Sequence, residues 1–165
     1  MENKILIVNT GGTFNKYYDP LKGELVVDQE EKALKALADA WMCEFEIINI
    51  IGKDSLQMNN HDRLELLAIL SQSDATRIIV VHGTDTMHLS AAYVDDAEME
   101  KKVVFTGAMV PYAIDPVEAT ANFALAYGAL LNISEDGIYI AMHGLCEHFS
   151  RIRKDTQQGK FVRVD

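Results

Sequence analysis

The chain has 165 residues, of which 48% are hydrophobic and 24% are charged, and its formal net charge is -10. This length and apolar content predict one globular domain with a sizeable core and exclude a disordered chain. The acidic balance argues against nucleic acid and anionic membrane as partners, since both attract basic surfaces.

The start of the chain does not resemble a signal peptide, and no apolar run is long enough to span a bilayer. Cys43 and Cys146 lack the spacing of metal ligands or of a disulfide framework. Free thiols are typical of a reducing compartment. The sequence therefore predicts a cytoplasmic location.

Apolar runs of strand length recur along the chain. They are rich in β-branched residues and continuous rather than alternating, which is typical of strands covered on both faces. The predicted strands are residues 5–8, 45–51, 78–81, 103–105 and 138–142.

Helical patterns lie between these strands. Two segments carry apolar residues at helical spacing, which would form the buried face of each helix. These faces are Leu34, Leu37 and Trp41 in residues 30–41, and Leu64, Leu67 and Leu70 or Ser71 in residues 62–71. Because strands and helices alternate, we predict an α/β fold, a three-layer sandwich with a mostly parallel sheet.

Two short sequences carry helix start signals. Asp28 with Glu31 three residues later resembles a capping box. Asp115, Pro116 and Glu118 supply a capping aspartate, a first-turn proline and a reciprocal glutamate before the next apolar run.

Two regions depart from the alternation of strands and helices. Residues 15–25 are polar and aromatic and contain turn signals, so we expect a loop or short hairpin over the end of the first strand, in the position of a lid. The tail, residues 148–165, mixes basic residues with one short predicted strand, residues 161–164.

Hydroxylated residues follow two of the predicted strands directly. Thr13 comes after Gly11 and Gly12, and Thr84 and Asp85 come after a second strand. In an open parallel sheet, ligands and catalytic groups gather at these strand ends. A hydroxyl nucleophile also needs a neighbouring base, and a desolvated lysine can take its proton. The leading hypothesis is therefore hydroxyl attack on a carbonyl.

Other sites are less well supported by the residues. The glycines near Thr13 fit neither the dinucleotide fingerprint nor the P-loop, and the histidines lack a metal-binding pattern. His82, at a buried strand end, is interpreted as a core residue. Lys154 is a candidate base on positional grounds, although a lysine in such a basic stretch is more often a solvated charge. We expect neither cofactor nor metal.

Taken together, three stretches resemble the amino-terminal domain of the bacterial-type L-asparaginase family. Residues 10–13 resemble its motif T-G-G-T-[IF], and residues 82–87 match H-G-T-D-T-M without a mismatch. Residues 103–111 resemble V-V-x-x-G-A-M-R-P, with Val110 where arginine is usual.

The resemblance implies hydrolysis of L-asparagine to L-aspartate and ammonia through an acyl-enzyme on Thr13. It implies that Thr84, Asp85 and Lys154 complete a catalytic triad. The lid tyrosine beside the nucleophile corresponds to Tyr18, with Tyr17 as the alternative.

The same resemblance assigns the substrate contacts. Ser55 would bind the α-carboxylate and Asp85 the α-amino group, with Gly12 and Gly83 lining the site. Backbone N–H groups near the two threonines would stabilise the oxyanion. Leu56 stands where a polar substrate-binding residue is common, which leaves L-glutamine open as a substrate.

Family members commonly have a second, carboxyl-terminal domain that contributes to the active site of a neighbouring subunit. This sequence, residues 1–165, corresponds to the first domain alone, so we expect a single catalytic domain without the usual second one. The resemblance also implies a homodimer or a higher homo-oligomer.

Three alternatives remain open from the sequence. In the first alternative the chain is a non-catalytic module that binds or senses an amino acid. In the second it is an amidase that acts on glutamine, on a D-amino acid amide or on an amide in a larger molecule. In the third alternative the strand ends are ordinary turns, and this purely structural interpretation is the weakest.

Overall fold

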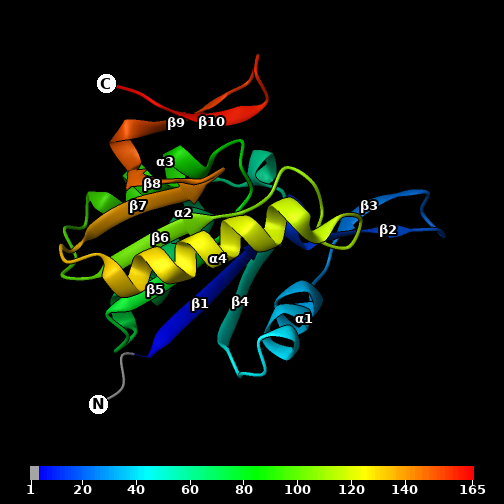
Figure 1. Cartoon of the computed structure of the whole chain (residues 1–165), viewed down its shortest axis with the longest axis horizontal. Helices are drawn as coiled ribbons and strands as arrows, with labels where there is room; N and C mark the ends of the chain where they lie inside the picture. Colours follow the sequence, from blue (N-terminus) through cyan, green and yellow to red (C-terminus); the bar gives the residue numbers. More distant parts are fainter. Residues whose placement is uncertain (1–3) are drawn as a thin grey trace.

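Six strands form a central sheet in the computed structural model of the protein, which describes residues 4–165 (Figure 1). Residues 1–3, at the start considered for a signal peptide, lie outside the described residues. The strands are β1 (Ile5–Gly11), β2 (Lys16–Asp19), β3 (Glu24–Val27), β4 (Glu46–Lys53), β5 (Arg77–Val81), β6 (Lys102–Thr106), β7 (Gly137–Met142), β8 (Leu145–His148), β9 (Ile152–Asp155) and β10 (Lys160–Arg163). The α-helices are α1 (Lys32–Ala40), α2 (Asn60–Gln72), α3 (Met87–Asp95) and α4 (Pro116–Asn132).

The central sheet has the order β4-β1-β5-β6-β7-β8. The first five strands are parallel, and only β8 runs antiparallel, against β7. Every residue of β1 is buried, as the continuous apolar run predicts for a strand covered on both faces. The α/β class and the mostly parallel sheet are thereby confirmed.

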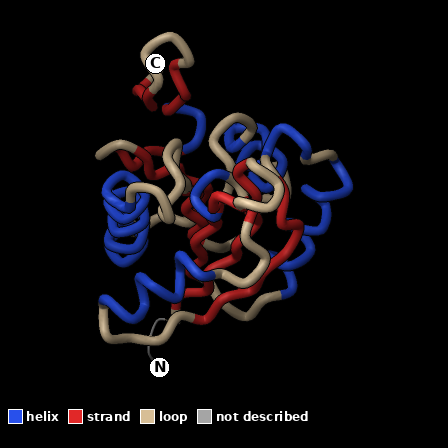
Figure 2. The backbone as a smooth tube through the Cα atoms, turned by 90° about the vertical axis from the view of Figure 1, so that its right-hand side faces the viewer, coloured by secondary structure: helices blue, strands red, loops and turns tan. Residues whose placement is uncertain are grey.

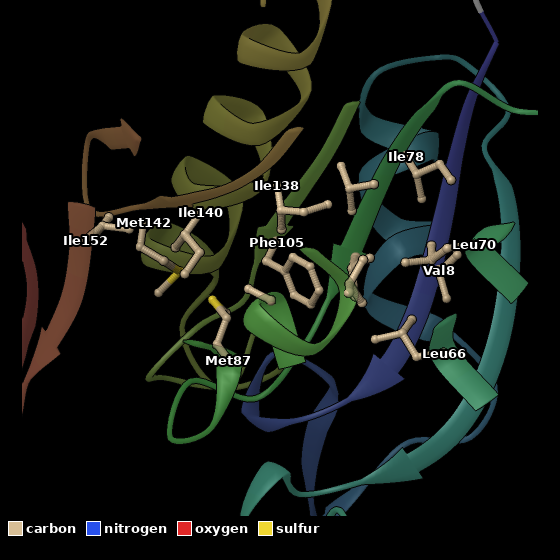
Figure 3. Close-up of a cluster of buried hydrophobic side chains, with 14 of the residues drawn as sticks. Val8, Leu66, Leu70, Ile78, Met87, Phe105, Ile138, Ile140, Met142 and Ile152 are labelled. Atoms are coloured by element: carbon tan, nitrogen blue, oxygen red, sulfur yellow. The ribbon is translucent and has the colours of Figure 1, made fainter. Parts of the chain in front are cut away.

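Helices cover both faces of the sheet, so the predicted three layers are confirmed (Figure 2). Apolar residues of α2 and α3 pack on one face, around Phe105 and Met87 (Figure 3). Those of α1 and α4 pack on the other, around Phe14 and Phe123. Helix α3 connects β5 to β6, and α4 connects β6 to β7, so both connections move one strand in the same direction along the sheet. Because the two helices lie on opposite faces, the two crossovers have opposite handedness.

Two hairpins extend from this body, β2–β3 at one end and β9–β10 beyond β8 (Figure 1). The first is the hairpin expected in residues 15–25. The second contains the predicted terminal strand and its unpredicted partner, β9. Ile152, labelled in Figure 3, and Phe161 anchor it, because both are buried in the core cluster that includes Met87 of α3.

The predicted capping box at the start of α1 is wrong. Glu31 itself occupies the N-cap position, in a left-handed conformation with φ 56°, and makes no side-chain cap bond. The Asp28 carboxylate instead accepts a hydrogen bond from the Lys32 N–H at 2.8 Å, so it caps the helix from one turn earlier.

The start and the buried face of α2 also differ from the prediction. Asn59 and Asp62 form a reciprocal capping box that the pattern of apolar residues did not indicate. Leu64 is 54% exposed, whereas Leu66 and Leu70 are fully buried. The buried face of α2 therefore includes the polar Arg63, which a prediction based on apolar residues alone does not assign to that face.

Candidate active site

The carboxyl ends of β1 and β5 lie side by side, and the strand order reverses between them, which is where open α/β sheets form a crevice. Gly12 and Gly83 follow these strands, and their backbones touch. A Cβ atom on Gly12 would stand only 2.4 Å from the Gly83 nitrogen. Thr13 and Thr84, the next residues, are therefore held on two loops in direct contact.

Thr13 begins a short 3-10 turn, Thr13–Asn15, that two buried amides hold in place. Asn9 and Asn15 exchange two side-chain hydrogen bonds of 3.1 and 2.8 Å. Asn15 Nδ2 also donates to the Gly11 carbonyl at 2.7 Å. The turn that presents Thr13 is therefore fixed to the end of β1 by side chains of its own segment.

Ser55 packs against the other side of the Gly83 backbone. A Cβ atom on Gly83 would stand 2.6 Å from the Ser55 Cβ, and Ser55 is only 1% exposed. The Thr86 N–H donates to Ser55 Oγ at 3.3 Å, and the Thr86 hydroxyl donates to the Ser55 carbonyl at 2.9 Å. Ser55 therefore joins the two loops as a third element of the site.

Asp54, beside Ser55, ties this segment to the β2–β3 hairpin. Lys16 Nζ lies 2.5 Å from its carboxylate. Burial raises the pKa of Asp54, but the hydrogen bond from Lys16, a backbone N–H and nearby ammonium charges outweigh it and hold that pKa below its usual value.

The hairpin β9–β10 brings Lys154 to the loop after β5. Lys154 Nζ donates to Thr84 Oγ1 at 2.9 Å and to Asp85 Oδ1 at 2.8 Å. The Thr84 residue is 7% exposed and the Lys154 side chain 16%, whereas the Asp85 side chain is 41% exposed. A hydroxyl, an amine and a carboxylate thus form one continuous path from a buried threonine toward solvent.

A chain of hydrogen bonds through His143 and Glu118 holds the hairpin that carries Lys154. Phe161, which pairs with Lys154 across β9–β10, donates its N–H to His143 Nδ1 at 3.1 Å. His143 Nε2 lies 2.6 Å from the Glu118 carboxylate. The other Glu118 oxygen accepts the Met109 and Val110 N–H groups, so the predicted reciprocal capping role of Glu118 is wrong.

Comparison with known proteins assigns the chain to a family. A family model described as Asparaginase, N-terminal matches residues 4–159. The chain belongs to the asparaginase family. Among solved structures, the thermostable L-asparaginase from Thermococcus kodakarensis superimposes with a TM-score of 0.84 at 23% identity, over 98% of this chain and 51% of that one. This likeness shows an asparaginase fold.

Two curated relatives show what else the family contains. A glutamyl-tRNA(Gln) amidotransferase subunit from Nanoarchaeum equitans is 34% identical over 142 residues, which cover 82% of this chain and 36% of the relative. A probable periplasmic L-asparaginase from Haemophilus influenzae is 32% identical over 84% of this chain and 42% of its own length. The chain thus spans 36% and 42% of the length of these two relatives.

The two hairpin tyrosines point to opposite faces of β2, as neighbours in a strand do. Tyr17 lines an apolar cavity of about 270 Å³ beside α1, with Lys32 Nζ 5.5 Å from its ring centroid. Tyr18 shares the face of Lys16, which reaches Asp54, and is 59% exposed. Of the two, Tyr18 therefore shares the strand face of the lysine that is tied to Asp54.

The structure brings most of the predicted site residues together, through Gly12 with Gly83, Gly83 with Ser55, and Lys154 with both Thr84 and Asp85. Tyr18 and Leu56 are exposed side chains, at 59% and 72%, and Leu56 directly follows Ser55.

The sequence did not predict the observed roles of three polar residues around the site, which are Arg63, Ser90 and Glu118.

His82 is fully buried, with hydrogen-bond partners on both ring nitrogens, as its interpretation as a core residue predicted. Within residues 4–165, no group of three His, Cys, Asp or Glu residues is arranged to hold a metal ion. No helix of that segment is long and apolar enough to cross a membrane.

Proposed function

We propose that this chain hydrolyses the side-chain amide of L-asparagine to L-aspartate and ammonia, with Thr13 as the nucleophile. The observation that carries the proposal is the position of Lys154 Nζ, 2.9 Å from the Thr84 hydroxyl and 2.8 Å from the Asp85 carboxylate. Thr84 and Asp85 follow Gly83, whose backbone touches the Thr13 loop. Binding alone requires neither a second threonine nor a lysine on its hydroxyl, which favours hydrolysis over a binding module.

In the first step, the Thr13 hydroxyl attacks the amide carbon. A C–O bond forms and the C–N bond breaks, while the hydroxyl proton passes through Thr84 and the Lys154 amine to the departing nitrogen, which leaves as ammonia. Asp85 stabilises the transient Lys154 ammonium. The product is an ester between Thr13 and the aspartyl group.

In the second step, water attacks this ester. The water proton passes through Thr84 and Lys154 to the Thr13 oxygen, which regenerates the hydroxyl and releases aspartate. Backbone N–H groups of Thr13 and Thr84 would stabilise the charge that develops on the carbonyl oxygen in both steps, usually the largest single contribution to such catalysis. This route requires no cofactor and no metal.

The substrate's charged groups fit two side chains of the site. Ser55 Oγ accepts the Thr86 N–H, which leaves its own proton free to donate to the α-carboxylate. The exposed side of Asp85 would hold the α-ammonium group. Leu56 offers neither charge nor hydrogen bond, so affinity for asparagine is expected to be modest.

The test is ammonia release by the purified chain from a panel of amides, with L-asparagine first. Thr13→Ala and Thr84→Val are each expected to lower turnover by about 10³-fold or more, while the unfolding midpoint stays close to that of the wild type. Thr156→Val, in an exposed turn, is the matched control and should change neither. Asparagine binding without turnover above the double variant would favour the binding module instead.

A second candidate is an amidase acting on glutamine or on another amide. It is favoured by the relative named as a glutamyl-tRNA(Gln) amidotransferase subunit, which shares 34% identity with this chain, and by the exposed Leu56. Faster ammonia release from L-glutamine or from a larger amide than from L-asparagine, abolished in Thr13→Ala, would select this candidate.

We also propose a homo-oligomer in the cytoplasm that binds neither nucleic acid nor membrane. Oligomerisation is supported by Val110, Ile114 and Val117, which are 40%, 57% and 72% exposed in the segment entering α4. The location is supported by Cys43 and Cys146, both free in the described chain. Light scattering on the full chain tests assembly, and a monomer at micromolar concentration would contradict it.

A further inference from the structure

A buried hydrogen-bond chain, which the proposed reaction does not use, ends on the peptide that precedes Thr84. Arg63 Nε in α2 donates to Ser90 Oγ in α3 at 3.0 Å. Ser90 Oγ lies 2.7 Å from His82 Nε2, and His82 Nδ1 lies 2.7 Å from the Gly83 carbonyl oxygen. Arg63 is 7% exposed, and Ser90 and His82 are fully buried.

The chemistry of these groups fixes the direction of every bond. An arginine can only donate, so Ser90 Oγ accepts from Arg63 and turns its own proton toward His82 Nε2. The imidazole must then carry its proton on Nδ1 and donate it to the Gly83 carbonyl. All three bonds therefore run one way, from α2 to the loop after β5.

The electrostatics keep the imidazole in this single form. Burial, together with the positive charge of Arg63, lowers the pKa of His82 to about 4, against the opposite effect of the hydrogen bond with the Gly83 carbonyl. His82 is therefore neutral throughout the neutral pH range, with one lone pair for Ser90 and one proton for Gly83.

The Gly83 carbonyl and the Thr84 N–H belong to the same planar trans peptide, so they point in opposite directions. Holding the carbonyl toward His82 therefore turns the Thr84 N–H away from the α2–α3 layer. In the described residues this N–H donates to no other group of the protein. A hydrogen bond received by the carbonyl also polarises the peptide and makes its N–H a better donor.

We infer that Arg63, Ser90 and His82 are positioning residues, which orient and polarise the Gly83–Thr84 peptide so that the Thr84 N–H donates to the oxyanion. This inference rests on the proposed hydrolysis and adds to it the device that aims one of its two backbone donors. Its effect is confined to the transition state, because the substrate carbonyl carries far less charge than the oxyanion.

The kinetic test compares Ser90→Ala and His82→Leu with the wild type. Loss of one oxyanion donor costs roughly 10²–10³ in kcat, so a misaimed donor should lower kcat about 10- to 100-fold with little change in KM. Thr106→Val is the matched control, because it removes a buried hydroxyl that bonds the Ala141 carbonyl at the next strand end. It should lose stability like Ser90→Ala but keep its kcat.

His82→Asn separates positioning from packing. Its amide nitrogen stands close to the place of Nδ1 and can donate to the Gly83 carbonyl, so it should recover most of the kcat that His82→Leu loses. A kcat for Ser90→Ala equal to that of Thr106→Val, or a His82→Asn variant no better than His82→Leu, would overturn the inference.

A second readout does not depend on activity. Nitrogen-15 NMR of the 18.4 kDa chain distinguishes the imidazole tautomers, and the expected spectrum shows the proton on Nδ1 of His82 from pH 6 to 8. A proton on Nε2 would overturn the relay even in an active enzyme. An Nδ1 proton in a chain that releases no ammonia from any amide would instead overturn the proposed function and leave the relay as a structural device.

Discussion

Replacing Gly12 by alanine tests the contact that brings the two threonine loops together. Gly12 has φ 74° and ψ 179°, a region that essentially only glycine adopts, at a cost of about 1–3 kcal/mol for other residues. The added Cβ would also lie 2.4 Å from the Gly83 nitrogen and 2.6 Å from its Cα. The Gly83 backbone cannot move aside as the end of a flexible side chain can. Overpacking at this contact therefore costs a further ~1–3 kcal/mol. We therefore expect the free energy of unfolding to fall by about 2–6 kcal/mol.

Gly159→Ala is the matched control. Gly159 has φ 66° in the turn of the β9–β10 hairpin, but nothing lies within 4 Å of its added Cβ, so only the left-handed backbone costs energy, about 1–2 kcal/mol. Urea unfolding followed by the fluorescence of Trp41, the single tryptophan, measures both values.

The same substitution should also affect turnover. Separating the loops by about 1 Å is expected to lower kcat roughly 100-fold in the Gly12→Ala protein that remains folded. Equal stabilities of the Gly12→Ala and Gly159→Ala variants, together with an unchanged kcat, would refute the argument that a glycine contact assembles the site.

Three further predictions concern other parts of the chain. Lys154→Met should lower kcat by about 10³-fold because it removes the proton acceptor, whereas Lys160→Met on the paired strand should not, as steady-state ammonia assays will measure. His82 has a pKa of about 4 when folded and 6.5 when unfolded, so the unfolded chain binds the extra proton between these values. The unfolding free energy of the wild type should therefore fall by about 3 kcal/mol between pH 7.5 and pH 4. Urea titrations of the His82→Asn variant should not show this decrease. Gly128→Ala, inside α4 with open space around its Cβ, should raise the unfolding free energy by about 1 kcal/mol without affecting kcat.

The apolar runs predicted the central strands well, because burial on both faces leaves a continuous hydrophobic signature that needs no knowledge of partners. Polar strands escaped this criterion: β8 and β9 are short, and apart from the buried Ile152 their residues are half-buried or exposed, so pairing rather than hydrophobicity defines them. Helix caps were less predictable. Asp115 caps α4 as expected, but the tertiary position of Glu118 draws its carboxylate to Met109 and Val110 instead.

The site was predictable to the extent that it follows from strand ends. Thr13 and Thr84 could be placed near each other because parallel neighbours end at one edge of a sheet. Lys154 was a candidate base by its position in the chain, but only the family resemblance paired it with Thr84, since 70 residues separate the two. The buried Arg63 could not be found from the sequence at all, because a polar residue in a helix carries no local sign of the serine that it contacts across a helix interface.

The central claim is that Thr13 forms the covalent bond to the substrate while Thr84 and Lys154 move the proton. Acid quenching of the wild type and of Thr84→Val during turnover of L-asparagine, followed by peptide mass spectrometry, tests it most directly. We predict an aspartyl ester on the peptide that contains Thr13, absent from Thr13→Ala. Ammonia release at the wild-type rate by Thr13→Ala, or an ester on any other residue, would contradict it.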